Sequence, residues 1–409
     1  MKKLNRKQQE QNRRKLEREK EKTEFIAGMR RMIDLWGGEG SFALLPLLIV
    51  ENTYRCRVLP LKPNTEHDPD LDIKSTNNLH HLVADLTRKK DFNIPVNGVN
   101  FSLSEFLTIG YTVLRVVIYC RTNAEKEPWM SDFAARFNED TENELAGMAI
   151  NFCCKLAMII SLDAYDYEKD MLWFKYELTQ PHEGSIQMQH VITLYREKFE
   201  KRIFNTDAGA RSALRVSFGC VNLGVLYAKV ETTVLGVDHP TDEVPVYIQR
   251  HALHRLEERL DGLKRYDMQF SVFNSFEQPL VVRQHRNKVL IAYCLNNVKM
   301  GYFAAEYTQG ALLIHTFLFV TNNGTPEGQK LNELTGLDKL DKKYLTIDKL
   351  STFMHSDISS NERLKRLLIK AGCSCLLDIE KAVNTQNKNQ ETHAISDTIL
   401  KYIDVEKRA

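Results

Sequence analysis

The chain has 409 residues, of which 43% are hydrophobic and 27% are charged. This balance excludes a wholly disordered chain, a collagen-like fibre and a small disulfide scaffold, and the length favours two or three domains. The 56 basic and 54 acidic residues nearly cancel, but residues 1–31 hold 12 basic and only 5 acidic residues. A basic N-terminal arm therefore precedes a mildly acidic body.

Residues 1–24 form this basic arm. After Met1, its large apolar residues are only Leu4 and Leu16, so a helix here cannot bury a face. The pattern predicts either a solvated helical extension or a disordered arm. Clustered basic side chains attract phosphate because each contact releases counterions from nucleic acid. We expect nucleic-acid contacts from Lys2, Lys3, Arg6, Lys7, Arg13, Arg14 and Lys15. The alternative is a solubilising tail without a partner.

Residues 25–204 are predicted to form a mainly helical domain. A first helix is indicated by apolar residues at three- and four-residue spacing, namely Phe25, Ile26, Met29, Met32, Ile33 and Trp36. Gly37 and Gly38 end it. Ser102 and Ser104 predict the start of another helix, which runs through Cys120. The longest periodic stretch is Asp132–Ile160, and the helical pattern continues to about Gln180.

The chain is expected to be cytoplasmic and to make no membrane contact. Its first residues are charged and lack the apolar core of a secretory signal. The two most apolar stretches are interrupted by Pro46 and by Arg115, so neither predicts a span. The eight cysteines include no Cys-x-x-Cys pair. Free, buried thiols in a reducing compartment are the expected state.

Near Asn205 the pattern changes to alternation, which predicts an antiparallel sheet domain over residues 205–326. The expected strands are Ala213–Cys220, Val225–Leu235, Val244–Gln249, Gln269–Ser275, Pro279–Arg283, Lys288–Asn296, Lys299–Tyr307 and Ala311–Thr321. One amphipathic helix, residues 250–264, is expected to pack on them. Residues 327–409 return to helices and loops, with Asn361–Lys370 the best helix. The predicted fold class is therefore α+β, with a helical N-terminal domain, a helix-on-antiparallel-sheet domain and a helical C-terminal tail.

The helix at 250–264 concentrates candidate chemistry. Its leucines fall on one stripe, and His251, Arg255 and Glu258 fall nearly opposite, with Arg259 at the flank. Histidine titrates near neutrality and suits acid–base catalysis, while arginine can stabilise charge on phosphorus without a metal. These patterns predict a catalytic set of His251, Arg255 and Glu258, with Arg259 as a nucleic-acid contact. The alternative is a solvated helix face with ordinary ion pairs.

The string Val-Tyr-Ile-x-x-His-Ala-Leu-x-Arg-x-x-Glu-Arg, from Val246 to Arg259, resembles small BrnT-like toxin domains. It is also similar to related domains of the barnase–EndoU–colicin–RelE ribonuclease superfamily. The resemblance covers about residues 244–325 and implies metal-independent RNA cleavage. By this resemblance, His251 and Arg255 match the helix motif. Such toxins are usually free-standing, whereas this segment lies between two helical regions.

Further candidates lie in and near the strands that follow. They are His285, Arg286, Tyr302, Glu306, His315 and Thr321, of which His315 is the added catalytic candidate and Arg286 an added nucleic-acid contact. Alternation along its strand places His315 on one face with Leu313, Phe317 and Phe319. A core histidine is the alternative for His315. No phosphate-loop or dinucleotide motif is present, so no cofactor is expected. No metal-ligand spacing is present, so no metal is expected either.

Two functions follow from these observations. One is a nucleic-acid-directed protein that acts as a metal-independent endoribonuclease of toxin or defence type. The other is a non-enzymatic scaffold or nucleic-acid-binding protein that uses the basic N-terminal arm. The expected partner is RNA or another nucleic acid, and a protein partner is also open. An enzyme should gather the candidate histidines and arginines in one accessible cleft, whereas a scaffold should leave them scattered.

Overall fold

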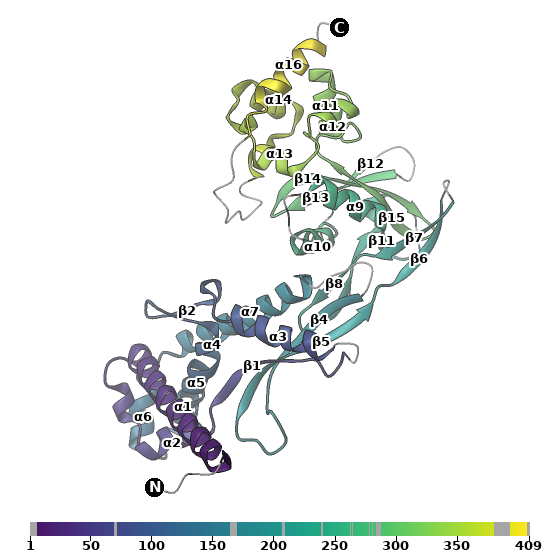
Figure 1. Ribbon diagram of the computed structural model, residues 1–409. Coiled ribbons are helices and arrows are strands. Elements are labelled where there is room, and N and C mark those ends of the chain that lie inside the picture. Colours follow the sequence, from purple (N-terminus) through teal and green to yellow (C-terminus); the bar gives the residue numbers. More distant parts are fainter. Residues whose placement is uncertain are drawn as a thin grey trace. The chain divides into compact units, whose positions relative to one another are not determined.

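The computed structural model describes residues 6–406, apart from 69–71, 164–169, 207–208, 239, 262, 264, 278, 280, 284–287 and 380–392. The chain is an α+β protein that folds into two compact units (Figure 1). Unit 1 comprises Met1–Ser161, Leu172–Arg196 and Cys220–Gly224. Unit 2 comprises Leu162–Met171, Glu197–Gly219 and Val225–Ala409. The finer domain bounds at residues 24, 204 and 326 stay predictions.

Unit 1 is built mainly from helices. They are α1 (Arg6–Gly37), η1 (Ser41–Leu44), α2 (Leu47–Arg55), α3 (Ile73–Leu86), η2 (Lys90–Phe92), α4 (Leu103–Glu105), the π-helix η3 (Phe106–Gly110), α5 (Tyr111–Thr122), α6 (Pro128–Ala134) and α7 (Glu139–Asp163). The predicted helix start at Ser102 is confirmed, because its hydroxyl caps α4 by accepting a hydrogen bond from the Glu105 amide. Helix α1 ends where Gly38 adopts a positive φ of 91°.

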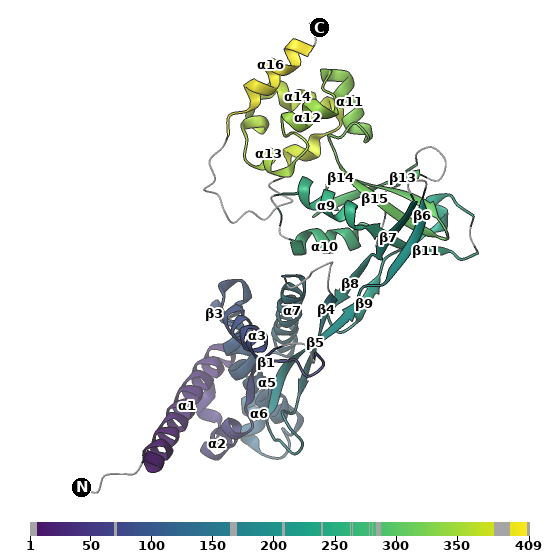
Figure 2. The same cartoon turned by 45° about the vertical axis from the view of Figure 1, so that its right-hand side comes forward.

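The first predicted helix supplies one wall of the unit 1 core. Phe25, Met29, Met32, Ile33 and Trp36 are all buried, as their spacing predicts. Residues 6–24 continue the same helix N-terminally, which is the helical form of the two alternatives for the arm. From Gln9 to Glu21 every residue is exposed, so this half of α1 contributes nothing to the core. Figure 2 shows α1 as one long continuous helix.

Unit 1 also contains a sheet that the helical prediction missed. Its strands are β1 (Val58–Asn64), β5 (Met188–Lys198) and β4 (Asp170–Thr179), in that order, with β1 and β5 parallel. The prediction of helix to about Gln180 is therefore wrong for residues 170–179. Pro60 and Pro63, although proline is uncommon within strands, lie in β1. That strand is at the edge of the sheet, where a residue without an N–H is tolerated. A short hairpin of unit 1 is formed by β2 (Ile94–Val96) with β3 (Val99–Phe101). In a second hairpin, β8 (Ser217–Cys220) pairs with β9 (Gly224–Tyr227); its residues Cys220–Gly224 are assigned to unit 1 and the others to unit 2.

A buried polar group lies where this sheet meets the π-helix. His190 of β5 is fully buried, and its Nδ1 lies 2.8 Å from the hydroxyl oxygen of Tyr176. The ring of Tyr111 meets the imidazole edge-on, with centroids 4.6 Å apart. Burial lowers the pKa of His190 to about 4, against a carbonyl contact with Leu107 that raises it. The imidazole is therefore neutral in the folded chain near pH 7.

Two stretches of unit 1, Leu103–Thr122 and Glu139–Ser161, are long and apolar enough to cross a membrane. Of their most apolar windows, 56% and 39% are buried within the fold. Core helices pass the same test of length and composition. The expectation of no membrane contact stays a prediction.

Unit 2 contains a large sheet with the strand order β12-β13-β14-β15-β11-β7-β6, and β10 pairs beside β11. The strands are β6 (Lys201–Thr206), β7 (Gly209–Arg215), β10 (Lys229–Glu231), β11 (Glu243–Gln249), β12 (Val281–Arg283), β13 (Lys288–Leu295), β14 (Val298–Thr308) and β15 (Ala311–Phe319). We predicted an antiparallel sheet, and this is wrong for one pair of strands. β11 and β15 run parallel, so the sheet is mixed. A parallel pair needs a long crossover, which the intervening helices and strands supply.

The helices of unit 2 fall into two groups. Near the sheet are α8 (Thr232–Leu235), α9 (Arg250–Arg259) and α10 (Arg265–Asn274). The C-terminal group is α11 (Pro326–Thr335), α12 (Lys339–Tyr344), α13 (Leu350–Met354), η4 (Asp357–Ser360), α14 (Glu362–Ala371), η5 (Ser374–Leu377) and α16 (Ser396–Glu406). Helix α9 ends five residues before the predicted 264. The strand predicted at Gln269–Ser275 is wrong, because α10 occupies it, and residues 232–235 form α8 in place of a strand end.

The two faces of this sheet differ. Helix α10 covers the face of Phe303: the Tyr293 hydroxyl donates to the carbonyl of Met268 in α10 at 3.5 Å, and Phe276, two residues after the helix, stacks on the Phe303 ring. Helix α9 packs beside α10 (Figures 1 and 2). The opposite face, called here the Tyr247 face, carries two small apolar clusters: Phe204, Ala213, Tyr247, Ala311 and Leu313, and then Leu290, Ala292 and Tyr302.

Candidate functional site

Helix α9 has the amphipathic orientation that its sequence predicts. Ala252, Leu253 and Leu256 are buried, whereas His251 and His254 are exposed on the other side. His254 Nδ1 lies 4.0 Å from Glu257 Oε2, a weak surface pair. His251 is therefore open to solvent.

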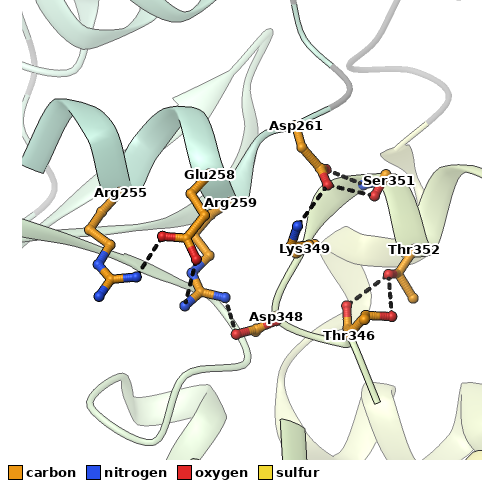
Figure 3. Close-up of polar contacts among 9 residues, drawn as sticks. All are labelled: Arg255, Glu258, Arg259, Asp261, Thr346, Asp348, Lys349, Ser351 and Thr352. Carbon is orange, nitrogen blue, oxygen red and sulfur yellow. Dashed lines mark hydrogen bonds and ion pairs between the residues drawn. The ribbon is translucent and has the colours of Figure 1, made fainter. Parts of the chain in front are cut away.

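The other predicted residues of α9 form a chain of ion pairs (Figure 3). Arg255 donates to Glu258 Oε2 at 2.5 Å, and Arg259 Nη2 lies 3.8 Å from Glu258 Oε1. Arg259 also donates to Asp348, in the loop before α13. Partial burial would raise the pKa of Glu258, but the hydrogen bond from Arg255 and the charges of Arg259 and Lys349 outweigh it and lower that pKa.

This chain of contacts attaches α9 to the C-terminal helices. Asp261 accepts hydrogen bonds from the amide of Ser351 at 3.0 Å and from its hydroxyl at 2.9 Å, and Lys349 lies 3.5 Å away (Figure 3). Arg259 is only 9% exposed. Its guanidinium is committed to Asp348 inside unit 2, and the nucleic-acid contact of Arg259 stays a prediction.

His315 lies on the Tyr247 face, away from α10. Ala304 pairs with Thr316 and Ala305 with Ile314, so His315 is the extra residue of a β-bulge in β15. The bulge reverses the alternation, because Phe317 pairs with Phe303 and joins the aromatic cluster on the helix-covered face. The prediction that His315 shares a face with Phe317 and Phe319 is wrong for this reason.

The side chain of His315 is held between two polar neighbours. Its Nδ1 lies 3.3 Å from Nε2 of Gln249, the last residue of β11, and its Nε2 lies 3.5 Å from Glu306 Oε2. When the Gln249 amide donates to Nδ1 of His315, the imidazole carries its proton on Nε2, which faces the Glu306 carboxylate. Glu306 was a sequence candidate, and the structure brings it together with His315.

A second polar group on the Tyr247 face was missed by sequence reasoning. Tyr247 donates to Glu200 Oε1 at 2.5 Å, and Arg215 donates to Glu200 Oε2 at 2.7 Å. The guanidinium of Arg202 lies 4.9 Å from the ring centroid of Phe204 and 5.9 Å from that of Tyr247, a cation–π arrangement. The alternation along β11 places Tyr247 and Gln249 on one face, but nothing local in the sequence pairs them with strands β6 and β7.

The pKa values of Glu200 and Tyr247 are shifted in opposite directions. Burial would raise the pKa of Glu200, but its hydrogen bonds to Tyr247 and Arg215 outweigh it and lower that pKa. Burial and the same Glu200 contact raise the pKa of Tyr247. At neutral pH the carboxylate is thus ionised and a weak base. Arg215 also lines an open depression of about 710 Å³ with Lys229 and Glu243.

The remaining strand candidates lie apart from this group. The Tyr302 hydroxyl donates to Glu327 at 2.9 Å and lies 3.1 Å from Lys299 Nζ. Thr321 is buried and donates to the Ile347 carbonyl. His285 and Arg286 lie outside the described residues.

The exposed half of α1 is a surface of alternating charge. Arg13 and Arg14 of the predicted contacts pair along the helix with Glu17 at 3.5 Å and Glu10 at 2.7 Å. Lys20 likewise pairs with Glu24 at 3.7 Å. Lys15 and Arg18 are exposed and have no ion-pair partner among the side chains that the structure describes. Lys2 and Lys3 lie outside the described residues, and only the backbone of Arg6 and Lys7 is described.

Within the described ranges, no three His, Cys, Asp or Glu side chains gather as a metal ion would require. All eight cysteines are free thiols, and Cys120, Cys153 and Cys373 are buried. No family model, curated protein or solved structure matches the chain. The resemblance to BrnT-like and related ribonuclease domains therefore stays a prediction.

Proposed function

We propose that this protein binds nucleic acid and that the exposed half of α1 supplies its phosphate contacts. The observation that carries the proposal is a helix that extends beyond its own core with every residue from Gln9 to Glu21 exposed. A helix that is polar all round buries no face of its own, and it is maintained by pairs such as Arg13–Glu17. Those of its cations that do not form such pairs are available to an external anion.

The pairing along α1 singles out two of these cations. Glu10, Glu17 and Glu24 have partners within the helix, and Glu21 accepts from Arg57 at 2.8 Å. Lys15 and Arg18 lie three residues apart and so project from neighbouring turns on one side. A phosphate that binds there displaces no ion pair of the described structure.

The test compares two double variants of the full chain that remove equal charge. Lys15→Ala with Arg18→Ala removes the two unpaired cations, and Arg13→Ala with Lys20→Ala removes two that are already paired. Binding to a fluorescent duplex and to a single strand is followed by anisotropy. The proposal expects a loss of affinity of tenfold or more for the first variant and a clearly smaller loss for the second. No binding by the unaltered protein at low salt would disprove the proposal.

A second candidate function is metal-independent cleavage of RNA. The observation in its favour is the His315–Glu306 pair on the Tyr247 face, the same face that carries Arg202 and Arg215. A histidine can transfer a proton near neutral pH, and an arginine can stabilise charge on phosphorus. His251 and Arg255, the residues of the predicted motif, lie on α9 instead.

This candidate is tested by incubating the protein with labelled RNA in EDTA. Cleavage that His315→Ala abolishes and His251→Ala leaves intact would place the chemistry on the Tyr247 face. The reverse result would return it to α9. Cleavage that is equal in both variants, or absent from all, would count against the enzyme.

A further inference from the structure

The charges on the exposed half of α1 are sorted by direction. At 3.6 residues per turn, Arg14, Lys15, Arg18 and Lys22 fall in one sector of about 100°. Glu10, Glu17, Glu21 and Glu24 fall in the adjacent sector on one side, and Glu19 falls on the other side of the basic sector. Gln11 lies within the basic sector and adds an amide to it. The basic sector extends over about 16 Å of helix, from Gln11 to Lys22.

Just after its exposed half, helix α1 is attached to the rest of unit 1. Arg57 pairs with Glu21 at 2.8 Å, and Lys22 donates to Glu51 of α2 at 3.2 Å. One turn further on, Phe25 is buried and meets the Tyr54 ring at 5.5 Å. The exposed turns before Glu21 are therefore a continuation of a fixed helix and keep its direction.

From these observations we infer that α1 enters the major groove of duplex DNA. The inference rests on the proposed nucleic-acid function and names the substrate class. A helix with its side chains is about 10–12 Å across, and the major groove of B-DNA is about 12 Å wide, so the groove admits it. The major groove of A-form RNA is too deep and narrow for side chains to read. With the basic sector in the groove, Gln11 lies near base edges, where amides pair with adenine, and Arg14 and Lys15 lie on its two sides, toward the phosphates.

A mere basic arm would behave differently, because charge alone attracts any phosphate chain. The helix breaker Leu16→Pro separates the two models. Leu16 is 68% exposed in the middle of the segment, so proline there interrupts the helix without removing a charge or a core contact. Leu16→Ala is the matched control, because alanine favours the helix.

The experiment measures binding of the full chain to a DNA duplex of about two turns, to the RNA duplex of the same sequence and to the single strands. The inference expects the DNA duplex to bind at least tenfold tighter than the others. Leu16→Pro should remove that preference, and Leu16→Ala should keep it. Equal binding to all ligands, unchanged by Leu16→Pro, would overturn groove entry and leave the proposed function intact. Binding to none would overturn both. Circular dichroism and the unfolding of unit 1 confirm that the variants fold.

Discussion

Arg259 of α9 and Asp348 of the loop before α13 form an ion pair in which both side chains are nearly buried. The pair joins the helix that the sequence marks for chemistry to the C-terminal helices of unit 2. Burial raises the pKa of Asp348 despite the charge of Arg259. The contacts of Arg259 thus hold α9 to the rest of unit 2, whereas His251 and His254 of the same helix stay exposed.

Removal of Arg259 should therefore destabilise unit 2. Arg259→Ala leaves the Asp348 carboxylate buried without its partner, which typically costs about 3–5 kcal/mol. Arg255→Ala is the matched control, because the Arg255–Glu258 pair is more than a third exposed and such pairs contribute about 0–1 kcal/mol. Hydrogen exchange of β15 amides in increasing urea reports the free energy of unfolding of unit 2. Equal losses in the two variants would refute the structural role of Arg259.

The fold could be predicted from the sequence where the residue pattern within one helix or strand decides which of its side chains are buried. The spacing of Met29, Met32 and Ile33 in α1 and the alternation through β13 and β14 are local signals, and all three elements form as expected. Asn296 and Asn297 take the positive φ values that their turn requires. The errors have nonlocal causes. Parallel pairing of β11 with β15 depends on the path of the chain between them, and residues 269–274 form a helix although their composition is typical of a strand.

The candidate site was less predictable for the same reason. Helical periodicity correctly separates Leu256 from His251, but it cannot show that Asp348 lies against Arg259. The Tyr247–Glu200 hydrogen bond joins residues 47 positions apart. His315 depends on a bulge, and one inserted residue moves the following side chains to the other face. Alternation alone therefore grouped His315 correctly with Leu313 but wrongly with Phe317 and Phe319.

The buried His190 predicts how unit 1 responds to acid. Its pKa in the folded chain, about 4, lies below its ordinary value of 6.5, so the unfolded chain binds the proton more tightly. Protonation of His190 therefore lowers the free energy of unfolding of unit 1. The loss is absent above pH 6.5, grows as the pH falls from 6.5 to 4, and reaches about 3 kcal/mol in total. Trp36, Trp129 and Trp173 all belong to unit 1, so tryptophan fluorescence follows its unfolding.

His190→Gln should flatten this part of the pH dependence, because glutamine keeps a polar contact for Tyr176 and does not titrate. His254→Gln, which changes an exposed histidine, should leave the profile unchanged. A profile of His190→Gln that parallels that of the unaltered protein between pH 6.5 and 4 would show that other groups control the acid response.

The proposed phosphate contacts predict a specific change in salt dependence. The slope of log affinity against log salt is about −0.9 for each phosphate neutralised on B-DNA. Lys15→Ala with Arg18→Ala should therefore make the slope shallower by about 1.8. Arg13→Ala with Lys20→Ala should change it less, because those cations already pair with Glu17 and Glu24. Slopes that shift equally would indicate attraction to the net charge of α1 without defined contacts.

Two glycines should respond to alanine in opposite directions. At Gly328, in the first turn of α11, a Cβ would lie 1.9 Å from the Asn322 carbonyl oxygen. That turn is held on both sides, since the Gly328 amide donates to Thr325 at 3.0 Å and its carbonyl accepts from the buried Lys342 at 2.7 Å. Gly328→Ala must displace the turn and should cost unit 2 about 1–3 kcal/mol or more, as overpacking does.

Gly147 is the contrasting case, because nothing lies within 4 Å of its Cβ position in the middle of α7. Alanine lowers the entropy of the unfolded chain there and should stabilise unit 1 by about 0.5–1 kcal/mol. Urea unfolding followed by tryptophan fluorescence measures the gain, and hydrogen exchange of α11 measures the loss at Gly328. If Gly328→Ala proved neutral, the close approach of α11 to the 322–325 turn would be wrong. If Gly147→Ala destabilised unit 1, the side of α7 at Gly147 would have to be covered by another part of the protein or by a partner.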